Sequence, residues 1–287
     1  MNTSKQGGMH MRIYAFADEA SPNVDLQIEA MKRNGLNGLE IRGVDGQSIA
    51  VITLDKAREV REKMDAAGLE TWTIGSPIGK VRIDEDNLEQ ELERLRHAIQ
   101  VAKILGAKNI RLFSFFIPKG EDPCTYRDEV LRRMKAFADV AEGSGIDLCH
   151  ENEKGIYGDN ADRCLEILQA EPRLKGIFDP ANFVQCNEDT LRAWNMLKSY
   201  IKYMHIKDAL DDGYVVPAGT GIGNVPQIVK EFMAQGGDAV TIEPHLTVFK
   251  GLADLEQEHN TTQVGKLTFS SADVAFDAAC NAFKELL

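Results

Sequence analysis

Four short segments in the C-terminal half of the chain each end an apolar run with a side chain that can bind a metal ion. The segments are IDLCHENE, GIFDPANF, KYMHIKDA and AVTIEPHL, and the side chains are Glu151, Asp179, His205 and Glu243. Three carboxylates and one imidazole that converge would hold one divalent cation. We therefore predict metal-assisted chemistry on a small oxygenated substrate.

Strand-like and helix-like segments alternate along the whole chain. The strand-like runs are residues 12–18, 38–43, 70–76, 109–115, 146–151, 174–179, 201–207 and 238–243. Helical patterns follow them at residues 23–35, 53–68, 87–106, 125–145, 161–170, 189–200, 224–237 and 271–287. Eight such pairs predict a (β/α)₈ barrel, whose active site lies at the C-terminal ends of the strands. An open doubly wound sheet rarely needs eight units and does not explain ligands on four successive strands.

No change of composition marks a boundary, so residues 1–287 are predicted to form a single domain. The helix at 53–68 is expected to begin at an N-cap, Thr53, and to end at a glycine. Five scattered cysteines without a CxxC pattern predict free thiols.

Charge and hydropathy exclude several classes of function. The net charge of −12 disfavours binding to nucleic acid, which requires clustered basic residues. No apolar run is long enough to span a membrane. The N-terminal sequence MNTSKQGGMHMR has no apolar signal-peptide core, so a cytoplasmic location is expected.

Each candidate ligand alone is weak evidence, because an acidic residue at a strand end is ordinarily a solvated loop residue. His205 could also be a buried histidine that is satisfied beneath a loop. Four candidates in register make coincidence much less probable. The alternation of Met204 and Ile206 with His205 and Lys207 places the latter two on one face. If His205 points inward, Lys207 is expected inward as well, as a substrate contact.

Two loops are longer or richer in glycine than a minimal barrel needs. Residues 208–223, DALDDGYVVPAGTGIG, contain a GxGxG pattern. A dinucleotide site requires a strand directly before such glycines, whereas a proline and the extended piece GYVVP intervene here. A tight active-site loop is favoured over a phosphate site. The stretch from Leu246 to Phe269 is predicted to be a lid or part of a homo-oligomer contact.

The motifs HEN, FDPAN, HIKD and EPH resemble those of the xylose-isomerase-like barrel superfamily over nearly the whole chain. That group includes sugar isomerases, ketose 3-epimerases, inosose dehydratase and apurinic-site endonucleases. The resemblance implies one divalent ion at the four ligand positions, with Mn²⁺ expected and Co²⁺, Mg²⁺ or Zn²⁺ as alternatives. It also implies that Glu151 and Glu243 act as an acid–base pair on a small sugar or polyol.

Such a pair has a clear physical role. Removing a proton beside a carbonyl produces an enediolate, which a metal ion stabilises as a Lewis acid. One carboxylate takes the proton and the other returns it from the opposite face, which inverts the carbon centre. A single base that moves the proton between two carbons would isomerise the substrate instead.

The chain also departs from the ketose 3-epimerase pattern. Asn182 stands where those enzymes carry a histidine. They also carry an arginine downstream of the metal histidine, whereas here HIKD is followed by the acidic ALDDG and the nearest cation is Lys207. The HxKD pattern is closer to that of inosose dehydratase, so a keto-sugar, a keto-inositol or a sugar acid stays open as substrate. The endonuclease branch uses a three-metal cluster with additional histidines, and only six histidines are present here.

Further candidates surround the four ligand positions, and some of them lie on the earlier strands. The predicted substrate contacts are Asn182, Lys207, His150, Arg111, Ser76 and Lys80. His150 has an alternative role, which is to hold a ligand carboxylate in place. Glu40 and Arg42 share one face of their strand and are interpreted either as substrate contacts or as a buried ion pair.

Three hypotheses of function follow. The first is a metal-dependent sugar isomerase or epimerase of carbohydrate metabolism. The second is a lyase similar to inosose dehydratase, which begins with the same proton abstraction and then protonates a leaving hydroxyl. The third is a sugar-binding barrel without catalysis, which the retention of all four ligands disfavours. The sequence does not decide between the first two.

Overall fold

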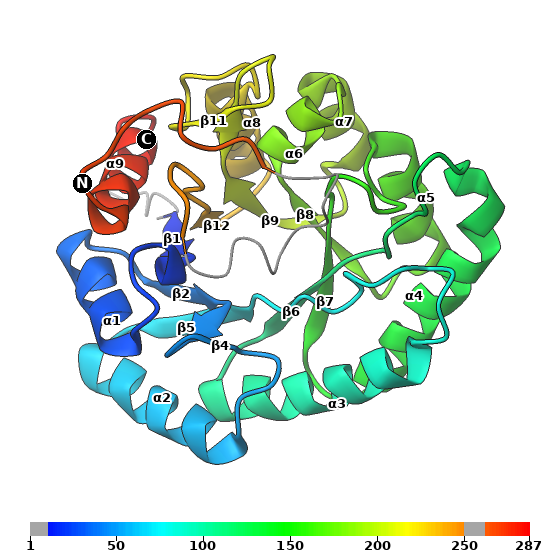
Figure 1. Cartoon of the computed structure of the whole chain (residues 1–287), viewed down its shortest axis with the longest axis horizontal. Helices are drawn as coiled ribbons and strands as arrows, with labels where there is room; N and C mark the ends of the chain where they lie inside the picture. Colours follow the sequence, from blue (N-terminus) through cyan, green and yellow to red (C-terminus); the bar gives the residue numbers. More distant parts are fainter. Residues whose placement is uncertain (1–10, 250–261) are drawn as a thin grey trace, which may run out of the picture.

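The computed structural model describes residues 11–249 and 262–287, and this part of the chain closes into a barrel of eight parallel strands (Figure 1). The strands are β1 (Arg12–Ala15), β2 (Gly38–Ile41), β5 (Glu70–Ile74), β6 (Asn109–Leu112), β7 (Asp147–Glu151), β8 (Lys175–Phe178), β9 (Ile201–Ile206) and β12 (Ala239–Ile242). Their order around the barrel is β1-β12-β9-β8-β7-β6-β5-β2. The predicted (β/α)₈ barrel is confirmed.

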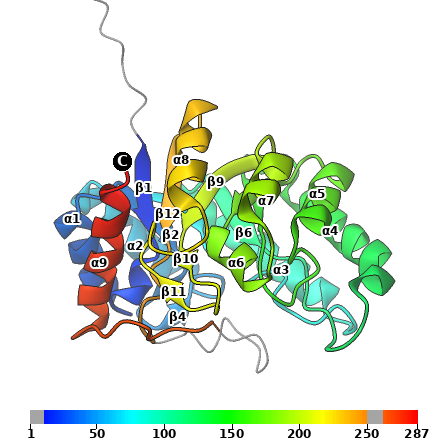
Figure 2. The same cartoon turned by 90° about the horizontal axis from the view of Figure 1, so that it is seen from above.

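Helices surround the strands, as Figures 1 and 2 show from two directions. They are α1 (Val24–Arg33), α2 (Leu54–Ala67), α3 (Leu88–Leu105), α4 (Arg127–Ala141), α5 (Ala161–Ala170), α6 (Pro180–Gln185), α7 (Thr190–Leu197), α8 (Val225–Ala234) and α9 (Ala272–Lys284). The expected caps of α2 are confirmed: the Thr53 hydroxyl accepts a hydrogen bond from the Lys56 amide, and Gly68 adopts a φ of 68°.

The main apolar core lies between the strands and the helices. On β9, Met204 and Ile206 are buried in this core, while His205 points into the barrel. Aromatic rings fill the space beneath α7, where Trp194 packs edge-on against Phe178 and Phe232. The alternation of side chains along a strand therefore separates the packing residues from the polar residues of the barrel interior.

Short elements extend the C-terminal ends of several strands. β3 (Gly43–Val44) pairs with β4 (Gln47–Ser48), and β10 (Asp208–Ala209) pairs with β11 (Val215–Val216). β11 corresponds to the extended piece expected before the glycine-rich pattern. Both hairpins lie toward the same end of the barrel in Figure 2. One-turn 3₁₀ helices, η1 (Ala17–Glu19) and η2 (Pro123–Tyr126), complete the described elements.

Helix α6 was not expected from the sequence. Its N-cap is the candidate ligand Asp179, whose Oδ1 accepts a hydrogen bond of 2.9 Å from the Asn182 amide. Pro180 occupies the first helical position, where its missing amide proton costs nothing. Because the helix has only 6 residues, it is too short to leave a clear helical periodicity in the sequence.

Further expectations from the sequence concern the cysteines, membrane spans, the lid segment and the domain and oligomer organisation. All five cysteines lie within the described residues and are free, as predicted. Among the described helices, none is long and apolar enough to cross a membrane. Half of the predicted lid or oligomer segment, residues 250–261, lies outside the described residues. That residues 1–287 form one domain, and that the protein forms homo-oligomers, stay predictions.

Candidate metal centre

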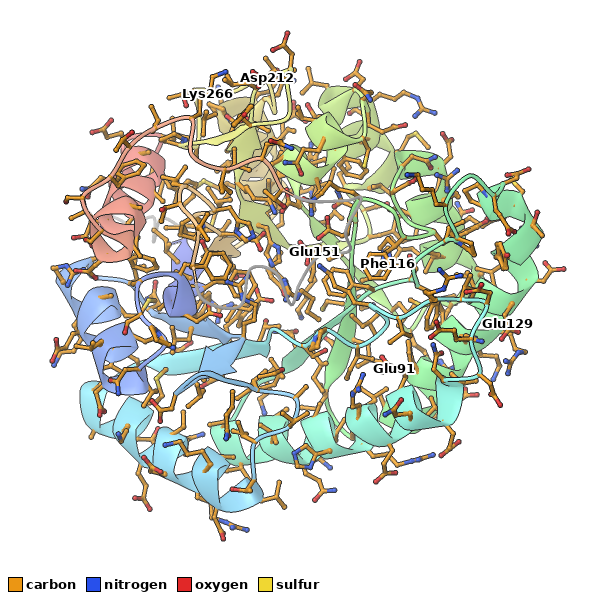
Figure 3. The ribbon with its side chains drawn as sticks, in the orientation of Figure 1. Glu91, Phe116, Glu129, Glu151, Asp212 and Lys266 are labelled. Atoms are coloured by element: carbon orange, nitrogen blue, oxygen red, sulfur yellow. The ribbon has the colours of Figure 1, made fainter. Side chains whose placement is uncertain are left out.

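The four predicted ligands meet at the C-terminal ends of consecutive strands. Glu151 ends β7, Asp179 follows β8, His205 lies near the end of β9, and Glu243 follows β12. Each offers one ligand atom, and these atoms all lie within 4.8 Å of one another. All four side chains are buried, and Figure 3 shows Glu151 near the centre of the ring of strands.

The spacing of these atoms suits one metal ion. Nδ1 of His205 lies 2.8 Å from Oε1 of Glu151, 3.6 Å from Oε2 of Glu243 and 4.0 Å from Oδ2 of Asp179. Such separations are expected around an ion with ligand bonds of about 2.0–2.3 Å. Oδ2 of Asp179 is buried and lies 3.0 Å from the Lys207 ammonium group. A buried set of three carboxylates and one imidazole fits a hard or borderline divalent ion.

His205 is enclosed by carboxylates on both edges of its ring. Its Nε2 lies 3.0 Å from Oε2 of Glu40, opposite the edge that faces Glu151. Burial by itself lowers the pKa of His205, but Glu151 and Glu40 outweigh burial and raise the pKa to about 10. A metal ion at Nδ1 therefore has to displace a proton from this ring.

Lys207 lies beside two of the ligands, in the inward position that the strand alternation predicts. Its Nζ is 2.8 Å from Oε2 of Glu243 and 3.0 Å from Oδ2 of Asp179. Burial raises the pKa of Glu243, yet Lys207 and other cations, among them Arg42, hold it well below its usual range. Burial raises the pKa of Asp179 to about 7, with Lys207 opposing the shift.

Arg111 and Asn182 lie beside the other glutamate. Nη1 of Arg111 donates a hydrogen bond of 3.0 Å to Oε2 of Glu151, and Nδ2 of Asn182 lies 3.4 Å from Oε1. Burial raises the pKa of Glu151, but His205 and Arg111 outweigh it and lower the pKa. The structure thus brings Lys207, Arg111 and Asn182 to the candidate ligands.

Three other predicted contacts have partners elsewhere. The Ser76 hydroxyl donates a hydrogen bond of 2.5 Å to the Arg111 carbonyl oxygen. Nζ of Lys80 pairs with Oε2 of Glu153 at 3.0 Å. Nε2 of His150 lies 2.9 Å from Oγ of Ser114, which also accepts a hydrogen bond from the Gly158 amide. The Ser114 hydroxyl therefore links His150 on β7 to the Gly158 backbone, and no hydrogen bond joins His150 to the Glu151 carboxylate among the described residues.

The interpretation of Glu40 and Arg42 as a mutual ion pair is wrong. Arg42 pairs with Asp18, with Nε to Oδ2 at 2.9 Å, and with Glu19, with Nη2 to Oε1 at 3.0 Å. Glu40 instead accepts hydrogen bonds from His205 and from Tyr203. Glu40 lies on β2 and Arg42 follows that strand directly, but the two side chains contact different partners.

Comparison with protein families identifies the family of the chain. The model described as "Xylose isomerase-like TIM barrel" matches residues 28–260. The chain belongs to this family. The family resemblance expected from the HEN, FDPAN, HIKD and EPH motifs is confirmed. A search of curated proteins finds no significant match.

Solved structures of this fold are similar over almost their whole length. The IolI protein with a bound zinc atom has a TM-score of 0.73 at 15% identity, covering 96% of this chain and 98% of that chain. D-allulose 3-epimerase from Methylomonas sp. has 0.73 at 16% identity, covering 97% and 99%. The probable 3-DHS dehydratase AsbF from Bacillus anthracis has 0.72 at 15% identity, covering 96% and 99%. The likeness shows a shared fold.

Within this xylose isomerase-like barrel, the glycine-rich loop is organised by a carboxylate of the chain itself. Asp208 accepts backbone hydrogen bonds from Ala209, Gly219, Gly221 and Gly223, at 2.9–3.0 Å. A Cβ at Gly221 would lie 2.4 Å from Oδ1 of Asp208. Because Asp208 occupies these amides, the tight-loop interpretation is favoured over a phosphate site.

A second group of possible ligands escaped the sequence analysis. Glu19, Glu243 and His245 also bring their ligand atoms within 4.8 Å of one another. Nδ1 of His245 lies 2.9 Å from Oε1 of Glu19. Arg42 contacts both Glu19 and Glu243, so its guanidinium group already pairs with the carboxylates of this group. The available signal was an acidic pair at the end of the first strand-like run, Asp18 and the Glu19 that follows it.

Proposed function

We propose that the protein is a divalent-metal-dependent sugar isomerase or epimerase that acts on a keto-sugar or related polyol by proton abstraction through an enediolate. The observation that carries the proposal is the convergence of Glu151 and Glu243 on one buried four-ligand cluster. Membership of the xylose isomerase-like family supports it.

The two glutamates are the acid–base pair in this proposal. They come from β7 and from the end of β12, on different arcs of the barrel. Neighbouring cations lower the pKa of each carboxyl group, so each carboxylate can accept a proton from carbon. One takes the proton from carbon. The other, which has first taken a proton from solvent, donates that proton to the opposite face of the substrate.

Lys207 and Asn182 are the proposed contacts to substrate oxygens. The Lys207 ammonium group is buried, and it lies beside Glu243 and Asp179. Asn182 contacts the Glu151 side, and its Oδ1 is buried without a hydrogen bond in the described structure. An ammonium donor and an amide acceptor on either side of the ligand cluster can bind and orient a polyhydroxylated substrate.

The chemistry of the donor set supports a divalent ion at Glu151, Asp179, His205 and Glu243. A divalent ion there supplies Lewis-acid stabilisation for negative charge that develops on a substrate oxygen. We propose Mn²⁺, with Co²⁺, Mg²⁺ or Zn²⁺ as alternatives, because three carboxylates and one imidazole suit all of these ions. The zinc atom of the IolI structure supports testing zinc first.

A lyase is the second candidate. It shares the proton abstraction and differs in that a leaving hydroxyl must also be protonated. The observation that favours it is the buried ammonium of Lys207, a proton donor 2.8 Å from Glu243. The similarity in fold to the dehydratase AsbF is compatible with either reaction.

Proton–deuterium exchange separates these candidates. The metal-loaded protein is incubated in deuterated buffer with a panel of keto-sugars and inosose, and the products are analysed by NMR and mass spectrometry. An epimerase or isomerase gives a rearranged product of unchanged mass apart from deuterium, and a lyase gives a product that has lost water. If the metal-loaded protein shows no exchange and no turnover with any compound of the panel, the result would contradict the proposal that it is an enzyme acting on these compounds.

A further inference from the structure

Glu40 is a buried carboxylate that the proposed reaction does not use. It lies on β2 and is 0% exposed. Its Oε2 lies 3.0 Å from Nε2 of His205, and its Oε1 accepts a hydrogen bond of 3.0 Å from the Tyr203 hydroxyl. Because β2 and β9 are not neighbours in the barrel, these contacts cross the barrel interior.

The two nitrogen atoms of His205 face different groups. Nδ1 lies 2.8 Å from Glu151 and 3.6 Å from Glu243, both candidate metal ligands. Nε2 faces Glu40 alone among these carboxylates. Glu40 therefore lies across the imidazole ring from the other carboxylates and does not belong to the four-ligand group.

We propose that Glu40 is a positioning residue of the metal centre, whose carboxylate accepts the Nε2 proton of His205 and so presents Nδ1 to the ion. A neutral histidine carries one ring proton, and the hydrogen bond made by one nitrogen decides which nitrogen is free for a metal. A carboxylate in this role also fixes the ring orientation and makes the ligand nitrogen more basic. The inference rests on the proposed metal centre but not on the proposed reaction.

The surroundings hold this arrangement in place. The Tyr203 hydroxyl occupies the second oxygen of Glu40, so the carboxylate cannot rotate freely. The rings of Phe16 and Tyr203 pack edge-on against His205, at centroid distances of 5.2 and 5.6 Å. Both the acceptor and the imidazole are thereby oriented before an ion arrives, as a positioned ligand requires.

A purely structural role for Glu40 is the competing explanation. Nε of Arg111 lies 4.0 Å from Oε1 of Glu40, and this ion pair alone would account for a charge inside the barrel. The two explanations differ in what the loss of the carboxylate changes. A structural charge affects folding whether or not His205 is present, whereas a positioning residue acts on metal affinity only through His205.

Metal affinity measured in a mutant cycle distinguishes them. Zn²⁺ and Mn²⁺ are titrated by calorimetry into metal-stripped wild-type protein and the Glu40→Gln variant, without substrate. We expect Glu40→Gln to weaken binding by roughly 10–100-fold, and Tyr203→Phe, which leaves the Glu40–His205 contact in place, by less than about tenfold. In a His205→Ala background, Glu40→Gln should cause no further loss. An equal loss in both backgrounds would overturn the proposal.

A measurement on the wild-type protein covers the case in which Glu40→Gln does not fold. In zinc-loaded protein, the ring nitrogens of His205 are observed by long-range proton–nitrogen NMR, with His205→Ala used for assignment. We expect the proton on Nε2 and the metal on Nδ1. A proton on Nδ1 with zinc bound would overturn this inference and leave the proposed function standing. Failure of the wild-type protein to bind any ion would overturn both.

Discussion

Lys207 and Glu243 form an ion pair inside the barrel mouth, with 2.8 Å between Nζ and Oε2 and both side chains nearly inaccessible to solvent. Asp179 shares the same ammonium group at 3.0 Å. Two candidate metal ligands therefore share the single positive charge of one lysine in the metal-free protein. The Lys207 ammonium group and a metal ion would therefore compete for the same two carboxylates.

Replacing Lys207 with Met should destabilise the metal-free protein by about 3–5 kcal/mol, because two buried carboxylates lose their cation. Saturating Zn²⁺ or Mn²⁺ should restore much of this loss, because the ion neutralises the same oxygens. Urea unfolding with and without metal measures both effects. The matched control is Lys202→Met, which removes a half-exposed pair with Asp147 and should cost about 0–1 kcal/mol. Equal losses in the two variants would contradict the prediction.

Metal affinity should rise with pH. His205, whose pKa is raised to about 10, carries a proton that the ion must displace, so the affinity should increase about tenfold per pH unit between pH 7 and 10. Below pH 7 the dependence should steepen, because Asp179, with a pKa of about 7, also becomes protonated. Calorimetry in buffers of different ionisation enthalpy counts the released protons. Binding without proton release at pH 8 would refute this assignment.

The four ligands could be predicted from the sequence because each follows an apolar run on a strand of its own. Parallel strands in a barrel end at the same rim, so position along the chain is enough to bring Glu151 and Glu243 together. The inward direction of Lys207 followed from the two-residue period of a strand.

The partners of these residues could not be predicted. The contact of Glu40 with His205 depends on how far each strand is displaced along the barrel axis, and local patterns do not encode that displacement. Glu19 and His245 are 226 residues apart, and they meet only when β1 closes against β12. His150 shares a strand with Glu151, but the alternation that points Glu151 inward turns His150 toward Ser114.

His150 should make the protein less stable in acid. Burial lowers its pKa from 6.5 to about 4, so the folded protein keeps the ring neutral while the unfolded chain takes up a proton. The contribution of the neutral His150 ring to the free energy of unfolding is therefore fully present above pH 6.5. It is lost as the pH falls toward 4, by about 3 kcal/mol in total. In His150→Asn this part of the pH dependence should disappear. Unfolding free energies at pH 7, 5.5 and 4 for both proteins test the prediction.

Asp208→Asn should destabilise the loop that carries the GxGxG pattern. The substitution keeps the size of the side chain but turns an amide donor toward backbone donors such as those of Gly219 and Gly221. We expect a loss of about 1–3 kcal/mol, measured by thermal or urea unfolding. Asp212→Asn, at an exposed position of the same loop, is the matched control. If Asp208→Asn unfolds like the wild-type protein, Asp208 does not hold the loop.

The central claim is that Glu151 and Glu243 exchange protons with a substrate carbon. Once a substrate is found, turnover and deuterium incorporation are measured for Glu151→Gln and Glu243→Gln, each shown by calorimetry to retain metal. Each variant should lose about 10²–10⁴-fold in turnover, and one of them should still exchange a single proton with solvent, because the remaining carboxylate acts on its own face. Near wild-type turnover in both variants, with metal bound, would contradict the two-glutamate mechanism and move the search for the base to Glu153, Lys207 and His150.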